Sequence, residues 1–339
     1  MEALLYPAYG ELAFRADLPE PAVGEGEVLV QVGACGICGS ELGSFASRSA
    51  RRVPPIIMGH EFAGEIAALG PGVEGLTVGQ RVVVNALVHC GACDLCRRGS
   101  THLCRNREVF GMDRHGAFAA RVNVPARVVY PLPDAVSMVQ GAMVEPLANG
   151  VHVVDLARRN SLETVLVCGA GTIGLMCSLA ARAAGAGRVA VTDTNEGRLR
   201  VARDLGADLT VNVATENLED TLREWTGGEG VELAVDAVGS AGARVDALRA
   251  TRPGGDVVWI GLHHDEVTLN TYEVVLPERR VMGSYAAADR DIRRAIDLFA
   301  EGRIPLDPWT EVFPLEAGAD VFLDMVHQRR PIIKAVLQP

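Results

Sequence analysis

The residues best suited to chemistry in this 339-residue chain are its cysteines. Four lie close together in a charged, glycine-containing stretch with the spacing C-x2-C-x2-C-x7-C: Cys90, Cys93, Cys96 and Cys104. Four thiolates so near one another can close a tetrahedral zinc shell with no open position, which makes such a site structural. An iron-sulfur cluster is the competing interpretation, but the stretch lacks the cysteine-proline run of the bacterial cluster motif. The spacing therefore predicts a structural zinc ion.

Three other cysteines, Cys35, Cys168 and Cys177, lie beside small or apolar neighbours and are interpreted as core residues. The chain shows no basic segment followed by an apolar export run, and no stretch of about 18 apolar residues that could span a membrane. We therefore expect a cytoplasmic protein whose thiols stay reduced. The net charge of -11 argues against nucleic acids and anionic membranes as partners and favours small molecules.

A glycine-rich turn indicates a nucleotide site. Gly169, Gly171 and Gly174 form G-x-G-x-x-G, with Thr172 and Ile173 between the last two glycines. The motif follows the apolar run TVLVC and precedes the helix-like LMCSLAARAA. Glycines at these points permit a tight turn and let a pyrophosphate approach the N-terminus of a helix. In this context the motif predicts dinucleotide binding.

The next predicted strand, RVAVTD, ends in Asp193, 19 residues beyond Gly174. A carboxylate there can accept hydrogen bonds from both adenosine ribose hydroxyls and would repel the 2′-phosphate of NADP, so NAD is the expected cofactor. Arg198 either lies along the adenosine or is an exposed helix arginine. The alternative to the whole site is a glycine-rich turn without nucleotide and with Asp193 as a solvated strand end.

A second set of possible metal ligands is scattered along the first half of the chain. Cys38 lies in C-G-I-C-G-S-E, His60 and Glu61 in M-G-H-E, and Glu145 in V-E-P-L. Taken singly, each has an ordinary interpretation: a buried thiol, a core histidine, a surface acid. Their presence beside a nucleotide motif and a separate zinc motif favours a metal site.

The length predicts two domains of ordinary size. The first 150 residues are rich in glycine and short β-branched runs, which predicts a β-rich, barrel-like domain with strands at Glu27–Val32, Gly64–Leu69 and Arg81–Val88. From Ser161 onward, apolar runs alternate with alanine-rich helical stretches, which predicts βαβ units on a doubly wound parallel sheet. Helices are expected near Leu199–Leu205, Ala241–Ala250, Asp291–Gly302 and Leu315–His327, before a terminal strand, IIKAVL.

The motifs C-G-I-C-G-S-E, G-H-E, the four-cysteine stretch, E-P-L and G-A-G-T-I-G follow one another in this order. In that order the chain resembles the zinc-containing medium-chain dehydrogenase/reductase family almost end to end. The glutamate of E-P-L and the length are similar to its polyol branch, which includes sorbitol, galactitol-phosphate, butanediol and threonine dehydrogenases. The resemblance implies an α/β fold, with a GroES-like β-rich catalytic domain of residues 1–150 and 287–339 and a Rossmann doubly wound parallel-sheet domain of residues 151–286. The sequence pattern alone does not assign the tail to either domain, and the resemblance assigns it to the catalytic domain.

The resemblance also implies an activity, the zinc-dependent transfer of a hydride from a secondary alcohol to NAD, giving a ketone. A catalytic zinc would be held by Cys38, His60 and Glu61 or Glu145, with one position open to water or substrate. Three anionic ligands at once would blunt the Lewis acidity of the ion, so one glutamate is expected to be labile or outside the shell. Ser40 matches the hydroxyl that accepts the alcohol proton; its alternative is a turn serine.

Several relatives carry a histidine three residues after that serine, where this chain has Gly43. The proton must then leave through water or another side chain, for which Glu61 and His152 are candidates. The preferred interpretation of His152, on the helix-like VHVVDLA stretch, is a packed residue.

The substrate stays open between polyols, sugar alcohols, cyclitols, sugar phosphates and threonine-like amino alcohols. Arg48, Arg51 and Arg52 are placed to meet a phosphate, but a solvated basic loop is the preferred interpretation. A non-catalytic nucleotide-binding protein of the same fold and a zinc-free quinone or enoyl reductase are the rivals, and the metal ligands disfavour both. The resemblance implies a homodimer or homotetramer joined through Rossmann edge strands such as DVVWIGL.

Overall fold

The computed structural model describes residues 1–157 and 162–339. Ser161, where the strand-helix alternation is expected to begin, lies outside these ranges. The chain divides into two compact units: unit 1 comprises Met1–Glu145, Ala288–Gly302 and Leu306–Pro339, and unit 2 comprises Pro146–Ala287 and Arg303–Pro305. One continuous helix, α4 (Val144–Leu156), contains both the first boundary and the position predicted for it, residue 150.

The main sheet of unit 1 consists of β3 (Glu27–Gly36), β5 (Glu61–Leu69), β6 (Arg81–Val84), β9 (Arg121–Pro125), β10 (Val129–Pro131), β17 (Thr310–Pro314) and β18 (Lys334–Gln338). Its order is β10-β6-β5-β3-β18-β17, with β9 also paired to β3. Along β3, Val28, Val30 and Val32 are buried and alternate with more exposed residues, as one face of a strand packed on a core requires. The strands predicted over Glu27–Val32 and Gly64–Leu69 lie within β3 and β5, which extend beyond them to Gly36 and back to Glu61.

Two smaller sheets complete the β-structure described in unit 1. One has the order β2-β1-β4, from β1 (Ala3–Ala8), β2 (Glu11–Arg15) and β4 (Ile56–Ile57); the other pairs β7 (Leu87–Val88) with β8 (Glu108–Val109). The run Arg81–Val88, expected as one strand, is therefore split into β6 and β7. The cause is local, because the side chain of Asn85 accepts a hydrogen bond from the Leu87 amide and turns the chain.

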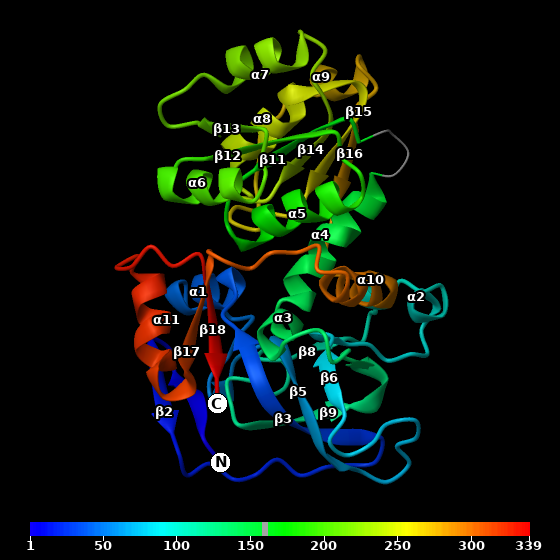
Figure 1. Ribbon diagram of the computed structural model, residues 1–339, viewed down its shortest axis with the longest axis vertical. Coiled ribbons are helices and arrows are strands. Elements are labelled where there is room, and N and C mark those ends of the chain that lie inside the picture. Colours follow the sequence, from blue (N-terminus) through cyan, green and yellow to red (C-terminus); the bar gives the residue numbers. More distant parts are fainter. Residues whose placement is uncertain (158–161) are drawn as a thin grey trace. The chain divides into compact units, whose positions relative to one another are not determined.

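The helices of unit 1 are α1 (Gly39–Ala46), α2 (Asp94–Arg97), α3 (Met138–Ala142), α10 (Asp289–Ala300) and α11 (Gly318–Val326), with short 3-10 helices η1 (Thr101–Leu103), η2 (Ala126–Val128) and η3 (Leu315–Ala317). The helix expected over Leu315–His327 begins as η3 and continues as α11. The last strand, β18, lies beside β3 and pairs Val336 with Gly36 (Figure 1). This pairing brings the C-terminal tail into unit 1.

Unit 2 contains a parallel sheet of β11 (Thr164–Cys168), β12 (Arg188–Asp193), β13 (Leu209–Asn212), β14 (Val231–Asp236), β15 (Thr251–Trp259) and β16 (Arg280–Gly283). The order β13-β12-β11-β14-β15-β16 reverses direction beside β11, which confirms the predicted doubly wound sheet. All residues of β14 are buried, as in a strand covered on both faces.

Helices cover both faces of this sheet. They are α5 (Thr172–Ala183), α6 (Glu196–Asp204), α7 (Leu218–Thr226), α8 (Ala241–Ala250) and α9 (Tyr272–Val275). Figure 1 shows α5 and α6 on one side of the sheet and α7 and α8 on the other. The α/β fold class expected from the sequence is therefore confirmed.

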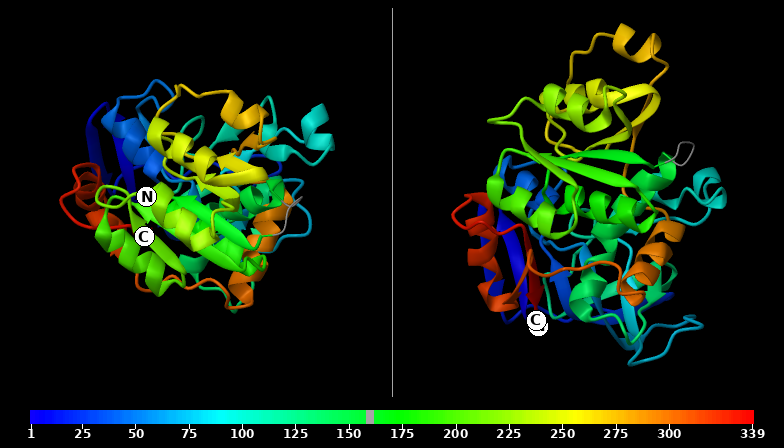
Figure 2. Two further views of the ribbon diagram at one scale, coloured as in Figure 1. Left: turned by 90° about the horizontal axis from the view of Figure 1, so that it is seen from above. Right: turned by 45° about the horizontal axis from the view of Figure 1, so that its top comes forward.

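The expectation that DVVWIGL forms a sheet edge is wrong. β15, which holds most of this run, lies between β14 and β16, so that the edge strands of the sheet in the described part of the chain are β13 and β16. In the right view of Figure 2, the chain between β15 and β16, including α9, extends away from the sheet. Among the described residues, no helix is long and apolar enough to cross a membrane.

Candidate metal centre and nucleotide site

The four-cysteine stretch folds into a compact lobe around α2 and η1. Its Sγ atoms are separated by 4.0 Å between Cys90 and Cys96, 3.5 Å between Cys93 and Cys96, and 3.9 Å between Cys93 and Cys104. Four sulfurs at the usual zinc distance in a tetrahedron lie about 3.8 Å apart. The hydrogen bond from the Cys96 amide lowers the pKa of Cys93 to about 6, which favours the thiolate form that binds zinc. The donor set therefore fits a closed zinc shell.

A second group of possible ligand atoms lies at the ends of β3 and β5. Atoms of Cys38, His60 and Glu61 all lie within 4.8 Å of one another. The antiparallel pairing of Gly36 with Glu61 explains why, since it sets the residues after β3 beside the start of β5. Glu145, in the first turn of α4, is buried, but its carboxylate is not part of this three-residue group. Its role as a ligand therefore stays a prediction.

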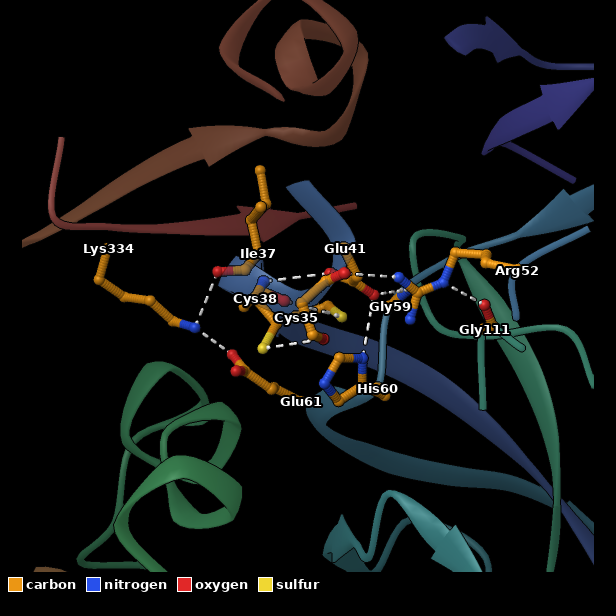
Figure 3. A network of polar contacts seen from close by, with 12 residues as sticks. Cys35, Ile37, Cys38, Glu41, Arg52, Gly59, His60, Glu61, Gly111 and Lys334 are labelled. Carbon is orange, nitrogen blue, oxygen red and sulfur yellow. Dashed lines mark hydrogen bonds and ion pairs between the residues drawn. The ribbon is translucent and has the colours of Figure 1, made fainter. Parts of the chain in front are cut away.

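Glu41 is a fully buried part of this site that the sequence analysis missed. Its Oε2 accepts a hydrogen bond from the Cys38 amide at 3.1 Å, and its Oε1 accepts one from the Gly59 amide at 2.8 Å and lies 3.0 Å from Nδ1 of His60 (Figure 3). A carboxylate only accepts, so Nδ1 carries the proton, and in the neutral imidazole Nε2 of His60 can bind a metal. A signal was available in the sequence, because a glutamate at the third position of a helix forms a capping box with the residue that precedes the helix, here Cys38.

The charge of Glu41 is secured by its surroundings. Burial alone would raise the pKa of this carboxyl, but the nearby His60 and Arg52 and the Cys38 amide outweigh burial and lower the pKa to about 2. Burial likewise opposes a charged imidazole, yet the negative charges of Glu41 and Cys38 raise the pKa of His60 well above its usual value. The same negative charges favour a bound dication.

Lys334 is the second buried partner of the site. Its Nζ donates to the Ile37 carbonyl at 3.0 Å and forms an ion pair with Oε2 of Glu61. Burial would lower the pKa of Lys334, but the negative charges of Glu61 and Cys38 raise it. A Cβ at Gly36 would lie 2.3 Å from Oε2 of Glu61, so only glycine leaves room for this pair. Lys334 is the only lysine in the sequence and interrupts an apolar terminal run, which was the signal that could have found it.

Ser40 lies beside the metal group. Its hydroxyl donates to Sγ of Cys38 at 3.3 Å, which keeps it a candidate for the proton of an alcohol. Gly43, one turn further along α1, is exposed, and His152 in unit 2 is buried, as expected of a packed residue. Cys35, Cys168 and Cys177 are also buried, as predicted.

The three arginines after α1 do not form one solvated loop. Arg48 and Arg51 are exposed, but Arg52 is 1 % exposed and donates to two backbone carbonyls. The expectation of a solvated loop is therefore wrong for Arg52, since its side chain turns inward beneath α1.

The glycine-rich turn of unit 2 has the geometry that its motif predicts. Gly171 is the residue before α5, with Thr172, Ile173 and Gly174 in the first turn of the helix. A Cβ on Gly174 would lie 1.8 Å from the carbonyl oxygen of Gly169, so helix and strand approach too closely for a side chain. The N-terminus of α5 is therefore shaped for a pyrophosphate.

Asp193 ends β12 next to this turn. Its Oδ2 accepts from the Ala170 amide at 2.8 Å and its Oδ1 from the Asn195 amide at 2.9 Å, which fixes the carboxylate beside the glycine turn. Nη1 of Arg198 lies 4.0 Å from Oδ2 of Asp193, and the side chain of Arg198 is 44 % exposed. Contact of Arg198 with an adenosine stays a prediction.

Comparisons with known proteins agree with both units. Residues 24–134 match the family model of the alcohol dehydrogenase GroES-like domain, and residues 172–301 match that of the zinc-binding dehydrogenase. The chain is 35% identical to L-threonine 3-dehydrogenase from Pyrococcus horikoshii over 309 residues, which cover 89% of this chain and 87% of that protein.

Similar solved structures extend over the whole chain. Galactitol-1-phosphate dehydrogenase from Escherichia coli has a TM-score of 0.94 at 26% identity, with 100% of both chains covered. A protein described as a zinc-binding dehydrogenase from Sinorhizobium meliloti 1021, bound to NADP, has a TM-score of 0.89 at 30% identity, covering 100% of this chain and 99% of that one. An alcohol dehydrogenase from Escherichia coli CFT073, complexed with NADH, has a TM-score of 0.92 at 28% identity, with the same coverage.

These findings confirm the resemblance and, at the level of the family, the predicted cofactors zinc and a nicotinamide dinucleotide. The chain is an enzyme of the alcohol dehydrogenase type. It belongs to the zinc-containing medium-chain dehydrogenase/reductase family, with relatives in the polyol dehydrogenase branch.

Proposed function

We propose that the chain transfers a hydride from a secondary alcohol of the polyol, sugar alcohol, cyclitol or sugar-phosphate type to NAD, giving a ketone. The observation that carries this proposal is the group of Cys38, His60 and Glu61, whose ligand atoms lie within 4.8 Å of one another. A thiolate, an imidazole and a carboxylate leave one position of a tetrahedral zinc free, which is the arrangement of a catalytic site.

The residues around this group have distinct tasks in the proposed reaction. A zinc ion held there supplies Lewis acidity to the alcohol oxygen, and the dinucleotide supplies the hydride acceptor. Glu41 orients His60 through Nδ1, and Ser40 accepts the proton that the alcohol loses while its own hydroxyl proton passes on to water. We infer that Glu61 would be the labile glutamate of a zinc ion held by Cys38 and His60, because Lys334 competes for its carboxylate, and that Glu145 would be the other glutamate ligand. This division avoids three anionic ligands on one dication.

The preference for NAD is supported by Asp193. Its carboxylate is held beside the glycine turn by two backbone amides, where it would repel a 2′-phosphate. Similar structures carry NADH in one case and NADP in another, so kinetics with both coenzymes test this preference. We expect a higher kcat/KM with NAD than with NADP, and a smaller ratio in the variant Asp193→Ala.

A screen of NAD reduction tests the proposal, with polyols, cyclitols, amino alcohols and phosphorylated and unphosphorylated sugar alcohols as substrates. We expect NADH formation with at least one secondary alcohol and none with the Cys38→Ala variant. Activity that survives this substitution would overturn the zinc mechanism. If the wild-type chain fails to reduce NAD with every alcohol tested, the result would favour the non-catalytic alternative.

A second candidate substrate is L-threonine, favoured by the 35% identity to L-threonine 3-dehydrogenase. The same screen separates the candidates, because a threonine dehydrogenase would show its highest kcat/KM with threonine. Phosphorylated substrates report on Arg48 and Arg51, which are exposed close to α1. Unchanged kinetics for every phosphorylated substrate after replacing both arginines would exclude a phosphate contact there.

We further propose that the chain is a cytoplasmic homodimer or homotetramer. The edge strand β16 offers unpaired backbone groups to a second copy, as sheet edges generally do. Light scattering gives the mass directly. A proline in place of Val281, in the middle of β16, is expected to reduce the assembly to a smaller species.

A further inference from the structure

A buried arginine next to the metal group is not used by the proposed reaction. Arg52 is 1 % exposed, and its guanidinium spans two backbone carbonyls (Figure 3). Nε donates to the carbonyl of Gly111 at 2.7 Å, and Nη1 donates to the carbonyl of Ser40 at 3.2 Å. Arg52 thus connects two segments that are 71 residues apart in the sequence.

One of these carbonyls belongs to a segment that carries a metal ligand, and the other belongs to a segment that packs against a second one. Ser40 lies between Cys38 and Glu41 in the first turn of α1. Gly111 packs against the residue before His60, since a Cβ at Gly111 would lie 3.1 Å from the Gly59 nitrogen. The guanidinium therefore fixes the spacing between the half of the site that bears Cys38 and the half that bears His60.

The fold alone does not account for this side chain. Taking a guanidinium out of water is costly unless it is fully hydrogen-bonded and near an opposite charge. Nη2 of Arg52 finds no hydrogen-bond partner in the described part of the chain, so the hydrogen bonding is incomplete. The opposite charge is Glu41, which is itself fully buried and binds His60. An apolar side chain of similar volume would pack there at lower cost, unless the charge and the two contacts serve the site.

We propose that Arg52 is a positioning residue of the metal centre, which clamps the segment of Cys38 and Glu41 to the segment that presents His60. The inference rests on the proposed function, because it assumes a metal ion at Cys38 and His60. It assigns no contact between Arg52 and the substrate, the metal or the dinucleotide. Arg52 acts through Ser40, Gly111 and Glu41.

Metal affinity tests the proposal without relying on activity. Zinc is competed from the holoenzyme with a chelator, and Co²⁺ is substituted to record the absorption of the one-thiolate site separately from the four-cysteine site. Arg52→Met is expected to weaken zinc binding at Cys38 and His60 by roughly tenfold, the lower range for loss of an outer partner of a ligand. Arg52→Lys keeps the positive charge and is expected to disturb the fold less. Its zinc affinity is expected to lie between those of Arg52→Met and the wild type.

A double-mutant cycle separates positioning from general stability. Because Arg52 and Glu41 act on the same two ligands, Arg52→Met is expected to add less than threefold to the loss already caused by Glu41→Gln. A purely structural arginine would instead add its full effect. The matched control is Arg81→Met, because Arg81 also donates to two backbone carbonyls, of Pro133 and Val136, in unit 1. It is expected to lower the melting temperature and leave zinc affinity unchanged.

The outcomes distinguish this inference from the proposed function. A wild-type chain that binds only one zinc would remove the proposed function and the inference with it. A wild-type chain with two zinc ions whose Arg52→Met variant binds both with unchanged affinity would overturn the inference alone. So would a loss in the Glu41→Gln background as large as the loss in the wild-type background.

Discussion

The two metal groups of unit 1 are assembled in opposite ways. The four-cysteine lobe takes all its ligands from 15 consecutive residues, Cys90 to Cys104, and two of them, Cys90 and Cys93, are only partly buried. The group of Cys38, His60 and Glu61 takes its ligands from two strand ends, and Glu41, Lys334 and Arg52 around it are buried charged residues. The four thiolates complete the shell of one ion by themselves, while the other site depends on the fold for the charged residues around its ligands.

This difference follows from what each ion has to do. A closed shell of four thiolates satisfies zinc completely and needs little from its surroundings. A shell with an open position must be held in shape by residues that do not bind the ion themselves, and their loss usually costs 10- to 100-fold in affinity or activity. The loss of one cysteine ligand should therefore have different effects in the two metal groups.

The largest expected contrast is between Cys38→Ala and Cys96→Ser. Cys38→Ala removes a ligand of the open site and is expected to lower kcat/KM by about 10³-fold or more, with little change in melting temperature, because a metal's charge stabilisation is worth several kcal/mol in the transition state. Cys96→Ser opens the closed shell and is expected to lower the melting temperature by several degrees, with kcat/KM per folded molecule within about tenfold of wild type. Kinetics and calorimetry on the same samples measure both. Equal activity losses in the two variants would contradict the division of roles.

A smaller effect is expected from Lys334→Met. Without Lys334, the described residues give the buried carboxylate of Glu61 no ion-pair partner, so it should bind zinc more tightly and fill the open position. We expect kcat to fall by roughly tenfold, which corresponds to about 1.4 kcal/mol, while zinc stays bound longer in the presence of a chelator. Lys334→Arg, which keeps the charge, is the control.

The sequence offers a second readout of this pair. Lys334 is the only lysine, so labelling with lysine carrying ¹⁵N at the side-chain nitrogen yields a single side-chain signal. That signal is expected to shift when zinc is removed from the wild type and to stay unchanged when zinc is removed from Cys38→Ala. A lysine that only supports the fold would give no shift in either protein.

Glu41 gives the pH dependence. Its pKa is lowered from 4.5 to about 2 in the fold, so its contribution to stability is fully present above about pH 4.5 and is lost as the pH falls toward 2. The difference in unfolding free energy between wild type and Glu41→Gln, both without metal, is therefore expected to be largest above pH 4.5 and to shrink toward pH 2. Urea titrations across this range measure it. A difference that grows on acidification would refute the assignment of the charge to Glu41.

The smallest effect concerns Gly43 in α1, the helix that carries Ser40 and Glu41. A Cβ there would meet none of the described residues within 4 Å, so alanine fits without strain. Gly43→Ala is expected to stabilise the chain by about 0.5–1 kcal/mol, because glycine loses more backbone freedom in a helix. Denaturant unfolding checks it. Destabilisation by alanine would mean that the open side of α1 is occupied in solution.

The comparison also explains what could be predicted from the sequence. The four-cysteine lobe and the glycine turn are local, so each spacing carries its own geometry, and β12 and α5 follow from apolar periodicity. The supports of the open site are not local, since Lys334 reaches Glu61 across 273 residues through the pairing of β18 with β3. Arg52 is unmarked in the sequence, because it stands beside two exposed arginines and only the fold turns it inward.

The direct test of two separately held metal ions is the zinc content of purified protein, counted per chain by mass spectrometry under native conditions. The account predicts two zinc ions in the wild type, one in Cys38→Ala, one in Cys96→Ser, and none in the double variant. The remaining ion should resist chelation in Cys38→Ala and yield readily in Cys96→Ser. A single zinc in the wild type, or two in Cys38→Ala, would contradict the account.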